Sequence, residues 1–75
     1  MKQTLSKKMG KLIRSLRQEK GLSQEEFAFL CKLHRTYIGA LERGEKNMTI
    51  STANKLTKVL GISMSDFFSQ LEQME

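Results

Sequence analysis

Apolar side chains recur every three or four residues in five segments of this chain, and strand-like alternation appears over no useful length. The first segment runs from about Ser6 to Lys20 and ends at Gly21, which adopts a left-handed conformation at low cost. Basic residues fill the face opposite its apolar stripe of Met9, Leu12, Ile13 and Leu16. The pattern predicts an all-α chain that begins with an amphipathic helix.

Two short helices with capping signals follow. Ser23 offers an N-cap oxygen, and Glu26 three residues later completes a capping-box pattern for a second helix that runs to about Cys31. His34 occupies the next cap position, and Gly44 ends the third helix. The inward stripe of this third helix consists of Ile38 and Leu41.

Two more helices complete the predicted bundle. Thr49 caps a fourth helix that ends at Gly61, with an inner face of Ile50, Ala53, Leu56, Val59 and Leu60. Ser63 and Asp66 repeat the capping pattern for a fifth helix over about 63–73, which bears Met64, Phe67, Phe68, Leu71 and Met74. With Pro absent and its five Gly expected at boundaries or turns, the chain is predicted to be a compact five-helix bundle that forms a single domain over residues 1–75.

Length and charge narrow the classes of function. Seventy-five residues make one small domain whose core is only marginally sufficient, which argues against an enzyme cleft and favours oligomerisation. The net charge is +6 over residues 1–20, +2 over residues 21–60 and −3 over residues 61–75. The basic first part suits a polyanion, whereas the acidic end suits neither DNA nor an anionic membrane.

The second and third helices, joined by a tight turn, have the layout of a helix-turn-helix DNA reader. The major groove of B-DNA admits one α-helix, whose first turn then meets base edges. Arg35 can form a bidentate pair with guanine, and Thr36 can offer a hydroxyl or a methyl group to a base. Small residues at Gly39 and Ala40 permit close approach to the groove floor, and the alternative for both is helix packing. We therefore predict base contacts from Arg35, Thr36 and Ala40.

Phosphate contacts are predicted on both sides of this helix. The start of the second helix presents free backbone N–H groups, with Ser23 and Gln24 as added donors. The loop residues Arg43, Lys46 and Asn47 and the Thr49 cap form a second clamp. Tyr37 is a further candidate for a phosphate contact, with packing at the helix junction as its alternative.

The segment from Leu22-Ser23-Gln24-Glu25 through Gly44, with Val59 to Ser63 and Asp66-Phe67-Phe68, resembles the phage Cro and repressor family of helix-turn-helix domains. Within that family, His34 to Ile38 and Leu41 to Asn47 are most similar to the controller proteins of restriction–modification systems. The resemblance implies the phage repressor DNA-binding-domain fold. It also implies a partly buried scaffold ion pair of Arg17 and Glu42, the alternative being two surface charges.

Three features depart from the family pattern. Lys32 stands where the turn often has Gly, and it costs about 1 kcal/mol if the left-handed conformation is kept. His34 is a poorer cap than Ser, Thr or Asp. Phe29 and Leu30 occupy positions that are commonly polar, so they are either extra core or an adhesive surface.

The fifth helix has more apolar surface than one small core requires. We predict that Met64, Phe67, Phe68 and Leu71 form a homodimer interface, with a larger core as the alternative. A two-fold dimer would set two reading helices about 34–36 Å apart, which matches an inverted-repeat operator.

Other chemistries receive less support. Cys31 and His34 together fall short of a zinc site, and they lack the orienting group of a catalytic pair, so we predict no metal, no cofactor and no enzyme activity. A lone Cys excludes an intrachain disulfide and favours a reducing, cytoplasmic location. No apolar run is long enough to span a membrane, and the basic first helix could lie on a membrane surface only if its stripe were not needed in the core.

The sequence therefore predicts a transcription regulator of bacterial or phage origin that binds double-stranded DNA as a homodimer on palindromic operators. The resemblance to controller proteins implies activation and autorepression of a restriction–modification operon, with RNA polymerase as a further candidate partner. The alternatives are a phage or plasmid repressor, an antitoxin-like autoregulator, and a protein-interaction module that has lost DNA binding.

Overall fold

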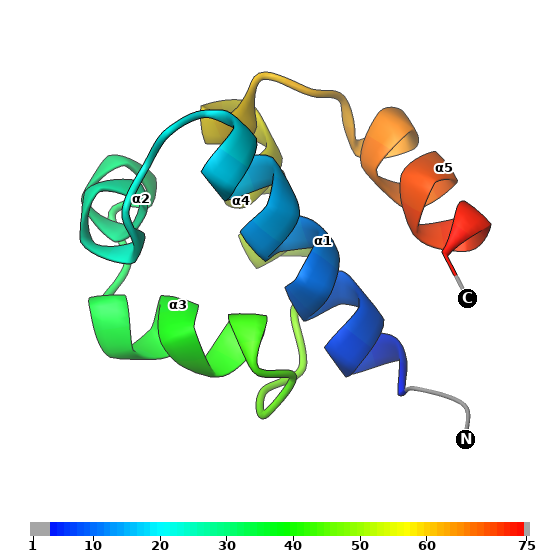
Figure 1. Cartoon of the computed structure of the whole chain (residues 1–75), viewed down its shortest axis with the longest axis horizontal. Coiled ribbons are helices and arrows are strands. Elements are labelled where there is room, and N and C mark those ends of the chain that lie inside the picture. The colour runs from blue at the N-terminus through cyan, green and yellow to red at the C-terminus, as the bar shows by residue number, and fades with distance from the viewer. Residues whose placement is uncertain (1–3, 75) are drawn as a thin grey trace.

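The structure is a computed structural model that describes residues 4–74, and within these residues it contains five α-helices and no strand. The helices are α1 (Leu5–Glu19), α2 (Gln24–Cys31), α3 (Arg35–Glu42), α4 (Ile50–Leu60) and α5 (Met64–Gln73). In Figure 1, α1 crosses the middle of the molecule in front of α4, with α2 and α3 to one side and α5 to the other. The all-α fold predicted from apolar spacing is confirmed.

Side-chain caps fix where these helices begin. The Glu26 amide donates to Ser23 Oγ over 3.0 Å, and the Ser23 amide donates to Glu26 Oε1 over 2.9 Å, so the predicted capping box is complete. Hydrogen bonding from the Ser23 backbone amide, and second from the Ser23 side chain, holds the pKa of the exposed Glu26 carboxyl below its ordinary value. The capping pattern predicted at the start of α5 is half formed: the Asp66 amide donates to Ser63 Oγ over 2.9 Å. The start of α1 lies one residue before the predicted one, at the Thr4 cap.

The turn between α2 and α3 keeps the left-handed conformation although Lys replaces Gly there. Lys32 has φ 58° and ψ 40°. Hydrogen bonds from Lys32 N to Phe29 O (3.1 Å) and from Leu33 N to Ala28 O (2.9 Å) satisfy the last carbonyls of α2 and offset the local cost. His34 then caps α3, because its Nδ1 accepts from the Thr36 amide over 3.1 Å.

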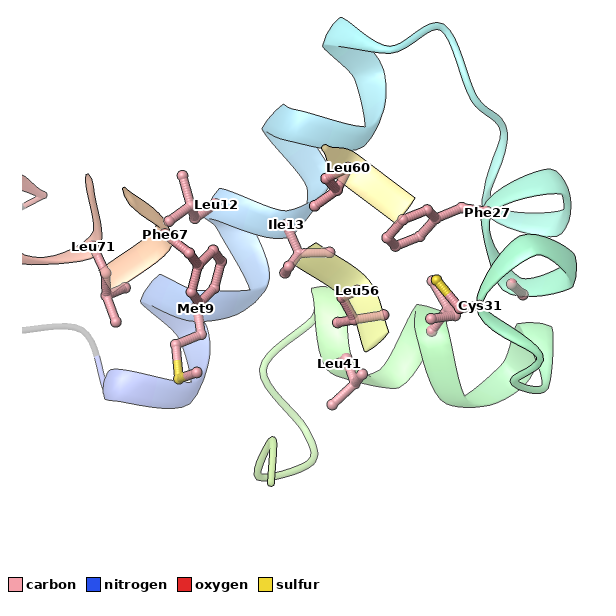
Figure 2. Close-up of a cluster of buried hydrophobic side chains, with 12 residues drawn as sticks. Met9, Leu12, Ile13, Phe27, Cys31, Leu41, Leu56, Leu60, Phe67 and Leu71 are labelled. Atoms are coloured by element: carbon pink, nitrogen blue, oxygen red, sulfur yellow. The ribbon is translucent and has the colours of Figure 1, made fainter. Parts of the chain in front are cut away.

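One apolar cluster joins all five helices. Figure 2 shows Phe27 and Cys31 beside Leu56 and Leu60 of α4, while Phe67 and Leu71 of α5 lie beside Met9 and Leu12 of α1. The predicted inner face of α4 needs one correction: Ile50 is 70% exposed, because it is the first residue of the helix and lies at the edge of the face formed by the buried Ala53, Leu56, Thr57 and Leu60.

The predicted dimer residues on α5 divide into two groups. Phe67 is 0% exposed and Leu71 is 5% exposed, and both belong to the chain's own core. Their burial supports the alternative of a larger core for these two residues, since here α5 covers α1. Met64 and Phe68 are only half-buried, and Phe68 packs edge-to-face on Phe67 with ring centroids 5.2 Å apart.

Two glycines lie inside helices. The sequence already places Gly39 within the third helix, whereas Gly10 departs from the expectation that glycines mark boundaries or turns. Gly39 lies within α3, and Gly10 lies within α1, where a Cβ would stand 2.3 Å from Leu41 O and 2.6 Å from Glu42 O. Those oxygens belong to backbone and cannot rotate away. The missing side chain thus allows α1 to contact the end of α3 directly.

We predict that Gly10→Ala destabilises the fold by about 1–3 kcal/mol, although Ala favours a helix more than Gly does. The cause is the clash with the α3 carbonyls. Urea unfolding measures the change, and Ser15→Ala, at an exposed position of the same helix, should stay within about 0.5 kcal/mol of the parent. A Gly10→Ala protein as stable as the parent would contradict this account of how α1 packs on α3.

Candidate nucleic-acid interface

The first turn of α3 is the exposed centre of the candidate site. Arg35 and Thr36 follow the His34 cap, and both are exposed. Tyr37 comes next and is half-buried: its ring packs against the core, and its hydroxyl lies 3.5 Å from Thr52 Oγ1 of α4. In the structure, the apolar ring of Tyr37 thus packs at the helix junction, and its hydroxyl group is only partly buried.

Ala40 does not share this exposure. It is 7% exposed, so its methyl group is not open to a base edge in this structure. This burial favours the helix-packing alternative for Ala40 over the predicted base contact. The burial of residues 38–42 shows that the second half of α3 packs against the rest of the protein, while its first turn stays free.

A buried ion pair anchors that second half. Arg17 Nε donates to Glu42 Oε2 over 2.7 Å and Arg17 Nη2 to Glu42 Oε1 over 3.0 Å. Arg17 Nη1 also donates to the carbonyl of Leu22 over 2.8 Å, in the turn before α2. The pair that the family resemblance implied is present, and it joins α1, the α1–α2 turn and the end of α3.

The start of α2 lies beside the first turn of α3. Ser23 and Gln24 line a shallow hollow of about 370 Å³ together with Arg17, Glu25 and Arg35. The Gln24 amide donates from Nε2 to Glu42 Oε1 over 3.0 Å, so the predicted phosphate donor also takes part in the scaffold. Two carboxylates in the first turn of α2, Glu25 and Glu26, oppose the attraction that its N-terminus has for an anion.

The loop after α3 is held by side-chain bonds. Ser6 Oγ donates to Asn47 Oδ1 over 2.7 Å, which attaches the loop to the start of α1. Thr49 Oγ1 accepts from the Thr52 amide over 3.0 Å and caps α4 as predicted. Lys46 is exposed.

Arg43 forms a two-bond ion pair that sequence reasoning missed. Its Nε donates to Glu45 Oε2 over 2.9 Å, and its Nη2 donates to Glu45 Oε1 over 3.1 Å. The bonds to Glu45 raise the pKa of the Arg43 guanidinium and lower the pKa of the Glu45 carboxyl. The sequence feature that could have revealed this pair is the acidic Glu45, two positions after the candidate DNA contact Arg43.

Cys31 and His34 do not form a reactive site. Cys31 is buried, and this burial, opposed weakly by Lys55, raises the pKa of its thiol to about 11. The Nδ1 atom of His34 is engaged in the α3 cap. Over residues 4–74, no group of three or more His, Cys, Asp and Glu side chains is arranged to hold a metal ion. Over the same residues, no helix is long and apolar enough to cross a membrane.

The helix-turn-helix family model matches residues 13–67, more than half of the chain. That segment includes α2 and α3 with their turn, the Arg17–Glu42 pair and the exposed Arg35 and Thr36. The chain therefore belongs to the helix-turn-helix family, as the residue pattern indicated.

Individual relatives show which members of the helix-turn-helix family this chain is similar to. The control protein C.MunI of a Mycoplasma species is 39% identical over 67 residues, covering 88% of this chain and 90% of that protein. The control protein C.BamHI of Bacillus amyloliquefaciens is 43% identical over 58 residues, covering 76% of this chain and 72% of that protein. Within the helix-turn-helix family, the chain is thus a member of the control proteins.

The same assignment follows from solved structures. The wild-type restriction–modification controller protein C.Esp1396I matches with a TM-score of 0.87 and 36% identity, over 96% of this chain and 92% of that chain. That protein has also been solved as a tetramer in complex with its natural 35 base-pair operator. The relatives are regulators and not enzymes, in agreement with the prediction from chain length.

We predict that Glu42→Leu destabilises the fold by about 3–5 kcal/mol, because it leaves the Arg17 charge buried without a partner. The double variant Arg17→Met/Glu42→Leu removes both charges and should regain much of that loss. Urea unfolding of the two variants measures the difference. A double variant less stable than Glu42→Leu would show that the two charges do not act as a pair.

Proposed function

We propose that this protein is a sequence-specific transcription regulator that inserts α3 into the major groove of its operator. The observation that carries the proposal is the exposed first turn of α3, where Arg35 and Thr36 stand free while the rest of the helix is packed. An exposed arginine at the start of such a helix is suited to the O6 and N7 atoms of guanine. Thr36 would contact a neighbouring base.

Phosphate contacts on both sides of α3 would fix its register on the DNA. On one side lie Ser23 and Gln24; the capping box engages the amides of Ser23 and Glu26, which leaves those of Gln24 and Glu25 to face a phosphate. On the other side we assign Tyr37, Lys46, Asn47 and Thr49. The Ser6–Asn47 bond supports this second group, since it holds the loop before DNA arrives.

We further propose that the protein acts as a homodimer on an inverted-repeat operator. Met64 and Phe68 are the half-buried apolar residues that α5 leaves for a second copy, and this use of α5 within a single domain over residues 1–75 is part of the proposal. The C.Esp1396I tetramer on its 35 base-pair operator supports self-association on DNA. Two reading helices related by a two-fold axis would meet successive major grooves.

The regulated operon is proposed to encode a restriction–modification system in a bacterium, as the similarity to control proteins supports. In this proposal, one operator site activates expression and a second site represses it when filled, so dimer concentration is the signal. RNA polymerase is then the partner through which activation would act. Neighbouring genes for a restriction endonuclease and a methyltransferase would distinguish this role from that of a phage repressor or an antitoxin.

Selection of bound sites from random double-stranded DNA tests the proposed function directly. The expected product is an inverted repeat whose half-sites are separated by about one helical turn, 34–36 Å. Recovery of unrelated sequences would contradict sequence-specific binding. Recovery of a single half-site without symmetry would retain DNA binding and contradict the dimer.

We predict that Arg35→Ala weakens binding to the selected operator by about 1–3 kcal/mol and changes binding to random DNA little, because it removes a base contact and not a phosphate contact. Fluorescence anisotropy on both DNAs measures this. Equal losses on operator and random DNA would contradict a base-reading role for Arg35.

We predict that Phe68→Ala shifts the protein toward monomer, because it removes the largest half-buried apolar side chain of α5. Sedimentation measures self-association. Phe29→Ala is the matched control: Phe29 is 80% exposed on α2, which lies on the opposite side of α1 from α5 (Figure 1), and its loss should leave self-association unchanged. Unchanged self-association of a folded Phe68→Ala protein would return Phe68 to the core alone.

A further inference from the structure

The Arg43 guanidinium lies over the middle of α3, although the residue itself is the C-cap of that helix. A Cβ placed on Gly39 would stand 3.1 Å from Arg43 Nη1 and 3.6 Å from Gln24 Oε1. Side chains lean toward the start of their helix, so Arg43 is directed back along α3 by one turn. Gly39 in turn lies one turn after Arg35. The arginine therefore shares a helix face with the proposed reading residues.

Glu45 fixes the orientation of this guanidinium. Both carboxylate oxygens accept from Arg43, one from Nε and one from Nη2, at 2.9 and 3.1 Å. Such a two-bond pair holds the guanidinium plane as well as its position. It occupies one edge of the group and leaves the edge formed by Nη1 and the second N–H of Nη2.

We propose that Arg43 is a further base-reading residue, that Glu45 positions it, and that Gly39 provides the space in which it lies. The inference rests on the proposed function, since it requires α3 to occupy the major groove. The edge of Nη1 and Nη2 presents two parallel donors, which match the O6 and N7 acceptors of guanine. The ligand is therefore a G·C base pair within each half-site, one or more steps from the base read by Arg35.

This proposal replaces the sequence-based assignment of Arg43 to a phosphate. A phosphate contact depends mainly on positive charge, and the Glu45 carboxylate offsets that charge at the closest possible range. A base contact depends on the direction of the donors, which the same carboxylate improves. Glu45 thus weakens a phosphate contact by Arg43 and strengthens a base contact.

The test compares variants on the selected operator, on operators with each base pair changed in turn, and on random DNA. The Arg43→Ala variant should bind the operator about 5- to 150-fold more weakly than the parent and bind random DNA about as tightly. It should also no longer distinguish the bases at one position of each half-site. Glu45→Gln should bind random DNA more tightly and discriminate less at that same base pair. Lys46→Ala is the matched phosphate control: it should weaken binding to every DNA alike and reduce the salt slope by about one.

Gly39→Ala separates recognition from folding. Its Cβ would press on Arg43 Nη1 and displace the guanidinium, while Ala suits an α-helix better than Gly does. The variant should therefore unfold at no lower urea concentration than the parent and still lose preference at the base pair assigned to Arg43. A Gly39→Ala protein with the parent's base profile would overturn the positional part of the proposal.

Two outcomes distinguish this inference from the proposed function. If the parent selects an operator and Arg43→Ala loses affinity for all DNA equally, with a smaller salt slope, Arg43 contacts phosphate and the inference is overturned alone. If the parent selects no operator, the proposed function fails, and the inference fails with it.

Discussion

The buried pair of Arg17 and Glu42 is the contact on which the position of the reading helix depends. Their side chains are only 9% and 2% exposed, so each charge relies on the other and on the Leu22 carbonyl and the Gln24 amide for compensation. In the structure, α1, the start of α2 and the end of α3 together satisfy all four groups. A pair of this kind need not add net stability, but losing one partner would leave the other charge buried and uncompensated, so the pair joins these three segments.

Anchoring α3 at its end leaves its beginning available. Gly10 lets α1 approach the last carbonyls of α3, and the ion pair holds the same end from the side. The first turn of α3 is consequently held in place, while the side chains of Arg35 and Thr36 are exposed. Such a preformed reading element would lose little conformational freedom on binding, which favours specific contacts.

The residue pattern alone predicted the helix caps, which depend on neighbours along the chain, whereas the Arg17–Glu42 pair between distant helices came from the family resemblance. The capping box of Ser23 follows from local backbone chemistry, whereas the left-handed position at Lys32 came from the family pattern, and both are present. The burial of Ala40 and Phe67 depends on which helix lies against them, and spacing alone could not decide it. Gly10 was missed for the same reason, since its role exists only where α1 meets α3.

The central claim is that α3 is held by its second half and meets DNA with its first. Amide chemical shifts recorded by NMR during titration with the selected operator test this most directly. The account predicts the largest changes over residues 35–39, with further changes at residues 23–25 and 43–49 on the two flanks. Changes that are largest over residues 64–73, or along the outer face of α1, would contradict it.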